Sequence, residues 1–227
     1  MEIICCALLS YLIGTISPSY LIAASKGVDI RKRGSGNAGA SNVMIVFGKS
    51  VGAICAILDI AKACLAIWAA QTLFPELSIA FPLAAAMCIL GHIFPFYMKF
   101  KGGKGLACLG GVILMYSGKL FIVMLLLEFI LAFVVDYICV VPMSASVAFS
   151  VIYGILDKDV LGMLLLLAVS VVIFMKHMEN FFEDPNFDIE DYSYDWEPVD
   201  NIEPDVVDGK YDIESFCRYN LLVCLKI

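Results

Sequence analysis

Long apolar runs with few charges fill the chain as far as residue 176, and they restrict the fold class. A helix needs about 20 apolar residues to cross the hydrocarbon core of a bilayer. Backbone groups in hydrocarbon must be paired within the chain, which favours helices over open strands. We therefore predict an all-α integral membrane protein, a bundle of about seven transmembrane helices. The candidate spans are residues 3–24, 51–74, 78–98, 105–118, 120–140, 142–156 and 160–176.

The composition supports a membrane protein with an unusual end. Hydrophobic residues make up 61% of the 227 residues and charged residues 16%, which is too apolar for a soluble domain of this length. The net charge of −7 arises at one end, because acidic residues crowd the stretch from Glu179 to Glu214. We predict a membrane domain over residues 1–183 and an acidic, disordered tail over 184–227. Nucleic acid is not an expected partner.

The basic residues between the apolar runs predict the orientation. The first loop carries Lys26, Arg31, Lys32, Arg33 and Lys49, and the third carries Lys99, Lys101 and Lys104, whereas the second has no lysine or arginine. Cytoplasmic loops of membrane proteins are enriched in these residues. The first and third loops are therefore expected to face the cytoplasm. The run of Arg31, Lys32 and Arg33 is interpreted as setting topology and attracting anionic lipid head groups.

Both basic loops are also rich in glycine. Residues 31–42 read RKRGSGNAGASN, and residues 91–95 and 99–105 read GHIFP and KFKGGKG. Glycine lets backbone N–H groups converge on an anion, and lysine supplies neutralising charge. The pattern predicts a phosphate site at the membrane surface, to which both loops contribute. Tight turns between helices are the alternative explanation.

A few charges fall inside the apolar runs. Asp59 and Lys62 are three residues apart, which places them on one face of the second span. They form either a structural ion pair or part of the wall of the active-site cleft, while Glu128 has no evident local partner. The nine cysteines show no metal-ligand spacing and are interpreted as packing residues, so no metal and no cofactor are expected.

The motifs resemble those of a known enzyme family. Residues 35–42 followed by Phe47-Gly48-Lys49, and residues 91–95 with 99–105, resemble the first two motifs of the PlsY family. His177-Met178-Glu179-Asn180 matches the third motif in part. These are bacterial acyl-phosphate:glycerol-3-phosphate acyltransferases of phospholipid biosynthesis. The resemblance implies a multi-pass protein of the bacterial inner membrane with a cytoplasmic active site. The implied reaction moves a fatty acyl group from acyl-phosphate to the 1-hydroxyl of glycerol-3-phosphate, giving lysophosphatidic acid and phosphate.

The resemblance also implies which residues form the site. Ser35 and Asn37 would bind the acyl-phosphate head group, and Lys104 would bind the second phosphate. Either histidine would serve as base, unless a phosphate oxygen of the substrate accepts the hydroxyl proton. The expected catalytic residues are Ser35, Asn37, His92, Lys104, His177 and Asn180. The expected substrate-binding residues are Gly36, Gly39, Ser41, Asn42, Lys101, Gly102 and Gly103. Among them, the backbone amides around Gly36, Gly39, Gly102 and Gly103 are expected to form an anion-binding concavity.

Several positions depart from the family pattern. The family has arginine where this chain has Ile45 and Met178, and a basic residue where it has Glu183. The acceptor half of the site is therefore expected to be weakened, and the donor half intact. Two alternatives to the enzyme remain: a divergent non-catalytic paralogue that binds acyl-phosphate or phospholipid, and a small organic-phosphate transporter.

Restoring both arginines should raise activity with glycerol-3-phosphate. The combined change Ile45→Arg and Met178→Arg adds charge-assisted contacts that each contribute about 1.5–3 kcal/mol, so KM should fall. Steady-state kinetics at varied glycerol-3-phosphate measure this. A double variant with the KM and kcat of its parent would contradict the interpretation.

Overall fold

The structure, a computed structural model, describes residues 1–134 and 140–182, with side-chain environments for 1–131 and 143–178. Within these residues all regular structure is helical. The predicted tail over 184–227, together with Glu183, lies outside the described residues. In chain order the elements are α1 (Glu2–Thr15), α2 (Pro18–Ser25), η1 (Ile30–Lys32), α3 (Ala40–Phe47), α4 (Lys49–Leu73), α5 (Ala80–Ile93), η2 (Phe96–Met98), α6 (Leu106–Tyr116), α7 (Gly118–Val134), α8 (Val140–Asp157) and α9 (Val160–Phe182).

Within the described residues, each predicted span consists mainly of helix, which confirms the all-α bundle. Within the described part, segments long and apolar enough to cross a membrane are Glu2–Ser25, Lys49–Leu73, Ala80–Met98 and Val160–Met178. The apolar helices Leu106–Tyr116 and Met143–Asp157 are shorter. Many large apolar side chains point outward along the bundle, as contact with lipid requires. The total of seven crossings stays a prediction.

The first span is broken, which the sequence analysis did not expect. Pro18 has no N–H and its ring excludes a continuous helix, so α1 ends at Thr15 and α2 begins three residues later. The break frees carbonyl groups inside the bundle. The Tyr97 hydroxyl donates to the Thr15 carbonyl at 2.6 Å, and the Lys62 ammonium donates to the Ile16 carbonyl at 2.5 Å. The short helix α3 was also not predicted.

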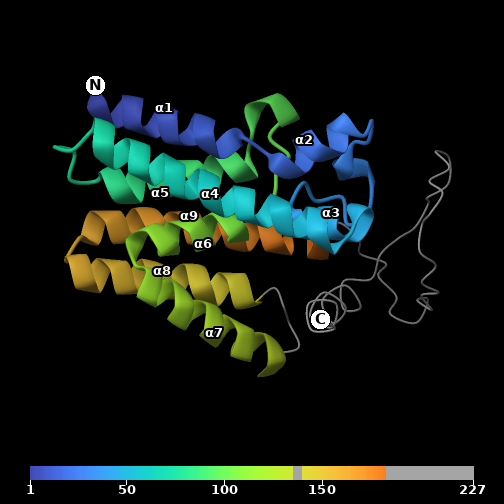
Figure 1. Cartoon of the computed structure of the whole chain (residues 1–227). Helices are drawn as coiled ribbons and strands as arrows, with labels where there is room; N and C mark the ends of the chain where they lie inside the picture. The colour runs from blue at the N-terminus through green and yellow to red at the C-terminus, as the bar shows by residue number, and fades with distance from the viewer. Residues whose placement is uncertain (135–139, 183–227) are drawn as a thin grey trace.

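Helix α5 lies at the centre of the bundle. It packs along α1 and also contacts α4 and α9, while α4 packs against α6 and α8 against α9 (Figure 1). Small residues allow this close packing: a side chain at Gly14 or Gly91 would collide with the backbone of the facing helix. The buried alanines of α4 and α5 have the same effect, and they are Ala63, Ala66, Ala70, Ala84, Ala85 and Ala86.

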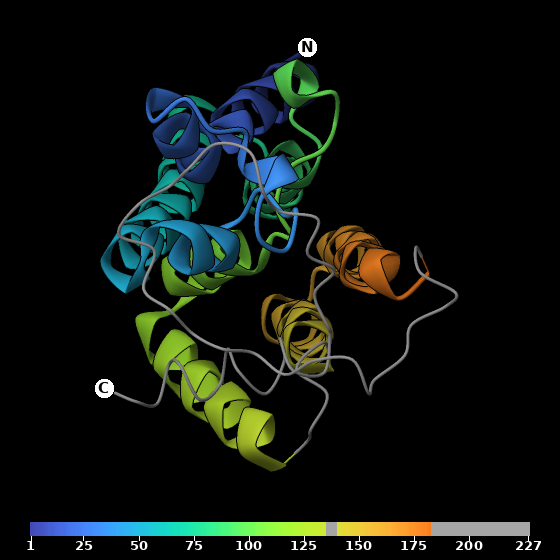
Figure 2. The same cartoon turned by 90° about the vertical axis from the view of Figure 1, so that its right-hand side faces the viewer.

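Both glycine-rich loops lie at one end of the bundle, where they share a small hydrophobic core. Ile30 and Val43 from the first loop region pack with Met98 from the second, and all three are buried. Figure 2 looks onto this end, where α2, α3 and the last turns of α9 lie around the loops. The prediction that the two loops meet at one end of the bundle is confirmed.

Arg31 joins the two loops directly. Its guanidinium pairs with both Asp29 oxygens at 2.9 and 2.8 Å and donates to the Met98 carbonyl at 2.9 Å. It also lies over the ring of Tyr20, 5.3 Å from the centroid. The hydrogen bond from Arg31 holds the pKa of the Asp29 carboxyl below its usual range. Arg31 therefore has a structural role, beyond the topology and lipid contacts inferred from the sequence.

Removing this guanidinium should loosen the contact between the loops. Arg31→Ala should speed amide hydrogen exchange over residues 98–103 and lower Tm by a few degrees, since a partly exposed ion pair contributes about 1 kcal/mol. Wild type should show the same loosening as the pH falls through the lowered pKa of Asp29, because protonation ends the pairing. Lys32→Ala is the control, since that side chain is exposed. Equal rates of amide hydrogen exchange in Arg31→Ala and Lys32→Ala would show that Arg31 does not hold the two loops together.

Candidate functional site

The first glycine loop is wrapped around the side chain of Asn42, which is fully buried. Its Nδ2 lies 3.0, 2.9 and 2.8 Å from the carbonyl oxygens of Ile30, Arg33 and Asn37. Its Oδ1 accepts from the Ser35 amide at 2.8 Å. Every polar atom of this side chain is therefore used by the loop backbone. We assign Asn42 to shaping the loop, in place of the substrate contact expected from the sequence.

Other side chains of the first loop remain available to a ligand. The Ser35 hydroxyl is buried and makes no hydrogen bond to any described residue. Asn37 is half-buried, and its Nδ2 covers Gly39, where an added Cβ would lie 2.8 Å away. Ser41 is exposed in the first turn of α3. Anion binding by Ser35 and Asn37 stays a prediction, with which the unpaired Ser35 hydroxyl is compatible.

Most of the glycine amides that were expected to bind an anion already donate hydrogen bonds within the chain. The amide of Gly36 donates to the Arg33 carbonyl at 3.1 Å, and those of Gly102 and Gly103 donate to Ile93 at 3.0 Å and His92 at 3.2 Å. A donor that is already paired inside the chain cannot also hold an anion. Anion binding by these amides is therefore not supported, whereas for Gly39 it stays a prediction.

The second glycine loop folds directly onto His92. The imidazole is buried at the end of α5, and a side chain at Gly103 would overlap its Nε2 atom. Only glycine allows the backbone to pass this close to the ring. Lys104 follows in a half-buried position, while Lys101 is exposed.

Helix α9 brings the second histidine to the same end. His177 is buried, with Nδ1 2.8 Å from the Ile173 carbonyl one turn earlier. A carbonyl only accepts, so Nδ1 carries the hydrogen and Nε2 presents a lone pair. Helix α9 packs along α5, the helix that carries His92, so both histidines lie towards the end of the bundle that holds the glycine loops. Asn180 follows in the same helix, but its side chain lies outside the described residues.

The charges inside the bundle meet at His92. Lys62 Nζ lies 2.7 Å from Asp59 Oδ1 and 2.9 Å from His92 Nδ1. These contacts join α4 to α5, as expected of a structural ion pair, and the alternative of a cleft wall stays a prediction. Ligand atoms of Asp59, His92 and Cys108 lie within 4.8 Å of one another, a spacing that suits a metal. Lys62 already supplies the positive charge there, so these residues do not indicate a metal site.

The sequence analysis missed several of these contacts. It placed Asp59 beside Lys62 but had no signal for His92 as their partner, because the contact joins α4 to α5. The one sequence signal for the carbonyl that Lys62 binds is Pro18, because a proline inside an apolar run predicts a break in the helix. For Glu128, the structure supplies the partner that was missing: Ser144 Oγ lies 3.3 Å from both of its oxygens.

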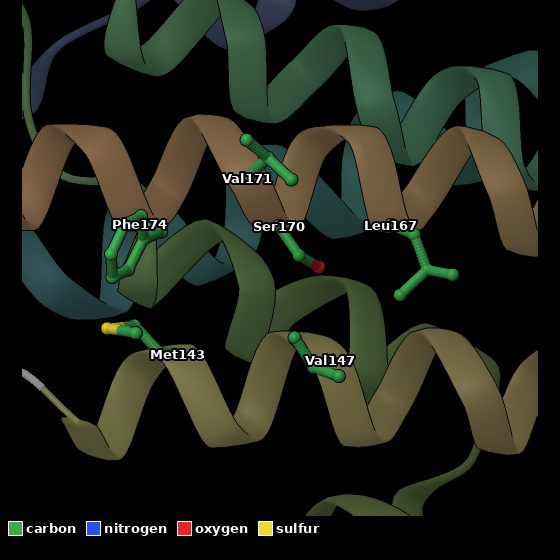
Figure 3. A pocket seen from close by; sticks show the side chains of 6 residues that line it. All are labelled: Met143, Val147, Leu167, Ser170, Val171 and Phe174. Atoms are coloured by element: carbon green, nitrogen blue, oxygen red, sulfur yellow. The ribbon is translucent and has the colours of Figure 1, made fainter.

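An apolar groove of about 250 Å³ is lined by residues of the packed helices α8 and α9, beside this end of the bundle. Figure 3 shows Met143 and Phe174 at one end of the groove, and Phe174 precedes His177 by one helical turn. The hydroxyl of Ser170 donates to the Leu166 carbonyl at 3.0 Å, so even this polar side chain turns its hydrogen to the backbone. The lining residues are Met143, Val147, Leu167, Ser170, Val171 and Phe174.

Removing the Asn42 side chain should disorder the first loop. Asn42→Ala leaves buried backbone groups unpaired, at about 1–3 kcal/mol, so Tm should fall by roughly 3–10 °C. Thermal unfolding in detergent measures this. Ser41→Ala is the matched control, because the neighbouring hydroxyl is exposed. A Tm for Asn42→Ala within one degree of the control would refute the assignment.

Comparison with known proteins identifies what this architecture resembles. A model of the glycerol-3-phosphate acyltransferase family matches residues 4–183. The glycerol-3-phosphate acyltransferase of Bacillus subtilis is 36% identical over 175 residues, covering 76% of this chain and 89% of the relative. The Thermotoga petrophila protein of the same description is 37% identical over 174 residues, covering 76% and 88%.

Solved structures give the same result. The crystal structure of PlsY, an integral membrane glycerol 3-phosphate acyltransferase, in its glycerol 3-phosphate form superposes with a TM-score of 0.71. The two are 28% identical, and the match covers 80% of this chain and 90% of that one. The lysophosphatidic acid form gives a TM-score of 0.69 at 27% identity, with the same coverage.

Proposed function

This chain belongs to the glycerol-3-phosphate acyltransferase family and is a membrane-embedded acyltransferase, and we propose that it acylates the 1-hydroxyl of glycerol-3-phosphate from acyl-phosphate. The products are lysophosphatidic acid and inorganic phosphate, which begins phospholipid biosynthesis. The PlsY resemblance stated from the motifs is confirmed. The non-catalytic and transporter alternatives are not favoured, because the chain matches acyltransferases over nearly the whole described part.

The first glycine loop suits the donor head group. The Ser35 hydroxyl is without a partner among the described residues, and Asn37 lies in the same loop with its side chain half-buried. Both side chains are neutral hydrogen-bonding groups held by a loop that Asn42 fixes. Lys104, on the neighbouring loop, supplies the positive charge that a phosphoryl group needs. We infer that these residues hold the acyl-phosphate and favour departure of its phosphate.

His177 suits the acceptor. Its Nε2 lone pair can accept a hydrogen bond from the 1-hydroxyl, since Nδ1 is held by the Ile173 carbonyl. The hydroxyl oxygen attacks the acyl carbon, the new ester bond forms, and the bond from that carbon to the phosphate oxygen breaks. The proton passes to His177 Nε2 or to a phosphate oxygen of the substrate. Asn180, in the next turn of α9, is proposed to orient the acceptor.

The apolar groove between α8 and α9 suits the acyl chain. It starts one turn from His177 and runs along the helices away from the charged end, between lipid-facing surfaces. An acyl chain lying there would place its activated end near the loops, with membrane lipid as the surrounding solvent. The distribution of lysine and arginine favours a cytoplasmic position for this end in the bacterial inner membrane.

The observation that carries the proposal is the meeting of three separate segments at one end of the bundle. The Arg31–Met98 contact joins the glycine loops, and α9, which carries His177 in its last turns, packs along α5. A transfer between two phosphorylated molecules needs such a composite site.

Phosphate release from acyl-phosphate should require glycerol-3-phosphate and the Lys104 charge. Lys104→Ala should lower kcat/KM by about 10²-fold or more, because a charge-assisted contact to phosphate is lost. The assay uses purified protein in detergent, with phosphate and lysophosphatidic acid measured together. Lys119→Ala is the control, since that lysine is exposed at the start of α7, beyond the far end of α6.

Two results would count against the proposal. Wild-type protein that forms no lysophosphatidic acid from these substrates would contradict the reaction. Release of phosphate at the same rate without glycerol-3-phosphate would indicate hydrolysis in place of transfer.

A further inference from the structure

The most unusual feature that the proposed chemistry leaves unused is a group of charges buried between α4 and α5. Asp59 is 1% exposed, Lys62 6% and His92 5%. Charges this deep in a membrane bundle are costly unless each is paired. Their arrangement therefore needs a reason beyond packing.

Lys62 lies close to three acceptor atoms. An ammonium has three hydrogens and no lone pair. Acceptor atoms lie at 2.5 Å (the Ile16 carbonyl), 2.7 Å (Asp59 Oδ1) and 2.9 Å (His92 Nδ1). The Ile16 carbonyl is available only because Pro18 breaks the first span. Lys62 therefore ties the break in α1–α2, its own helix and α5 together.

This contact fixes where the His92 hydrogen sits. Because Lys62 can only donate, His92 Nδ1 must accept, and the ring hydrogen belongs on Nε2. Asp59 Oδ1 lies 3.3 Å from the same nitrogen and would by itself favour a hydrogen there. Cys108 of α6 is the other titratable group at this ring. The position of Lys62 thus decides between two forms of the imidazole.

The other edge of the ring faces the second glycine loop. Nε2 abuts Gly103, at the place that a side chain would fill. The loop is tied back by the Gly103 amide to the His92 carbonyl and by the Gly102 amide to Ile93. Lys104 comes next in the chain. The Nε2 hydrogen is thus directed to the segment that presents the lysine of the site.

We propose that Lys62 is a positioning residue that holds His92 in the Nε2–H form, so that His92 is a fixed neutral hydrogen-bond donor beside the Lys104 loop and not a base. This inference rests on the proposed function and assigns a role within the same site. In the proposed function this loop holds a phosphoryl group, and we place that group within reach of the Nε2 donor. A preorganised donor of this kind stabilises developing negative charge. His177, with a bare Nε2, is left as the histidine that can accept a proton.

The tautomer can be read by nitrogen-15 NMR of histidine-labelled protein in lipid nanodiscs. The chain has two histidines, so His177→Gln isolates the signals of His92. We expect a protonated Nε2 and an unprotonated Nδ1, unchanged between about pH 6 and pH 8. A proton on Nδ1, or on both nitrogens, would overturn the proposal.

The part played by Lys62 is tested by Lys62→Met in the full-length protein. With the ammonium gone, Asp59 should draw a hydrogen to Nδ1, and the NMR signature should change accordingly. In parallel, kcat should fall about 10²-fold, as for loss of an oxyanion donor, with KM for glycerol-3-phosphate within about 3-fold. An unchanged signature or unchanged kcat would refute the role of Lys62.

Cys64→Ala is the matched control. It lies two residues further along α4, and its thiol contacts the Gly111 carbonyl, away from His92. This variant should keep both the wild-type signature and kcat. Should Lys62→Met fail to fold, the wild-type spectrum still decides the tautomer. A wild-type protein that is inactive but shows the Nε2–H signature would contradict the proposed function and leave the proposed tautomer of His92 intact. Failure of the function and failure of the tautomer assignment are therefore distinguishable.

Discussion

The architecture depends on pairing the Thr15 and Ile16 carbonyls, which the first span exposes where it breaks. Pro18 removes a donor and prevents helical hydrogen bonds across residues 15–17, and no water is available in the hydrocarbon to replace them. Lys62 and Tyr97 supply the missing donors, one from α4 and one from the segment after α5. The break thus attracts a cation to the bundle interior, and that cation in turn requires Asp59. The placement of His92 follows from the same requirement, because its Nδ1 is the remaining acceptor for the ammonium.

A second constraint holds the two glycine loops together at the bundle end. Loops rich in glycine have much conformational entropy to lose, so they need specific contacts to keep one shape. Asn42 provides these within the first loop, Met98 fills the core beneath both loops, and Arg31 bonds one loop to the carbonyl of the other. Glycine is required where the backbone passes the His92 ring, and not to direct amides at an anion. The loops are therefore ordered before a substrate arrives, which lowers the entropy that binding must offset.

The apolar runs predicted the helices well, because helix length and hydrophobicity in a membrane leave little choice. The clustering of lysine and glycine likewise identified the two loops that meet at one end of the bundle. What failed depends on contacts between segments distant in sequence. Arg31 was interpreted as a surface charge, because nothing local shows that Met98 lies beside it. Asn42 was taken for a substrate ligand, since an asparagine in a polar loop looks the same whether it faces a ligand or the loop backbone. The partner of Lys62 depends on the helix break and on α5, neither of which a spacing of three residues reveals.

The two histidines differ through their neighbours alone. His177 gives its Nδ1 hydrogen to a carbonyl of its own helix, which leaves Nε2 as an acceptor. His92 receives a hydrogen bond from an ammonium at Nδ1, which leaves Nε2 as a donor. A site that transfers an acyl group from acyl-phosphate to a hydroxyl needs both kinds of group, one to stabilise negative charge and one to accept the hydroxyl hydrogen. Ordinary helix geometry sets the first state, and the buried cation sets the second. The costly charge inside the membrane is thereby linked to the chemistry at the surface.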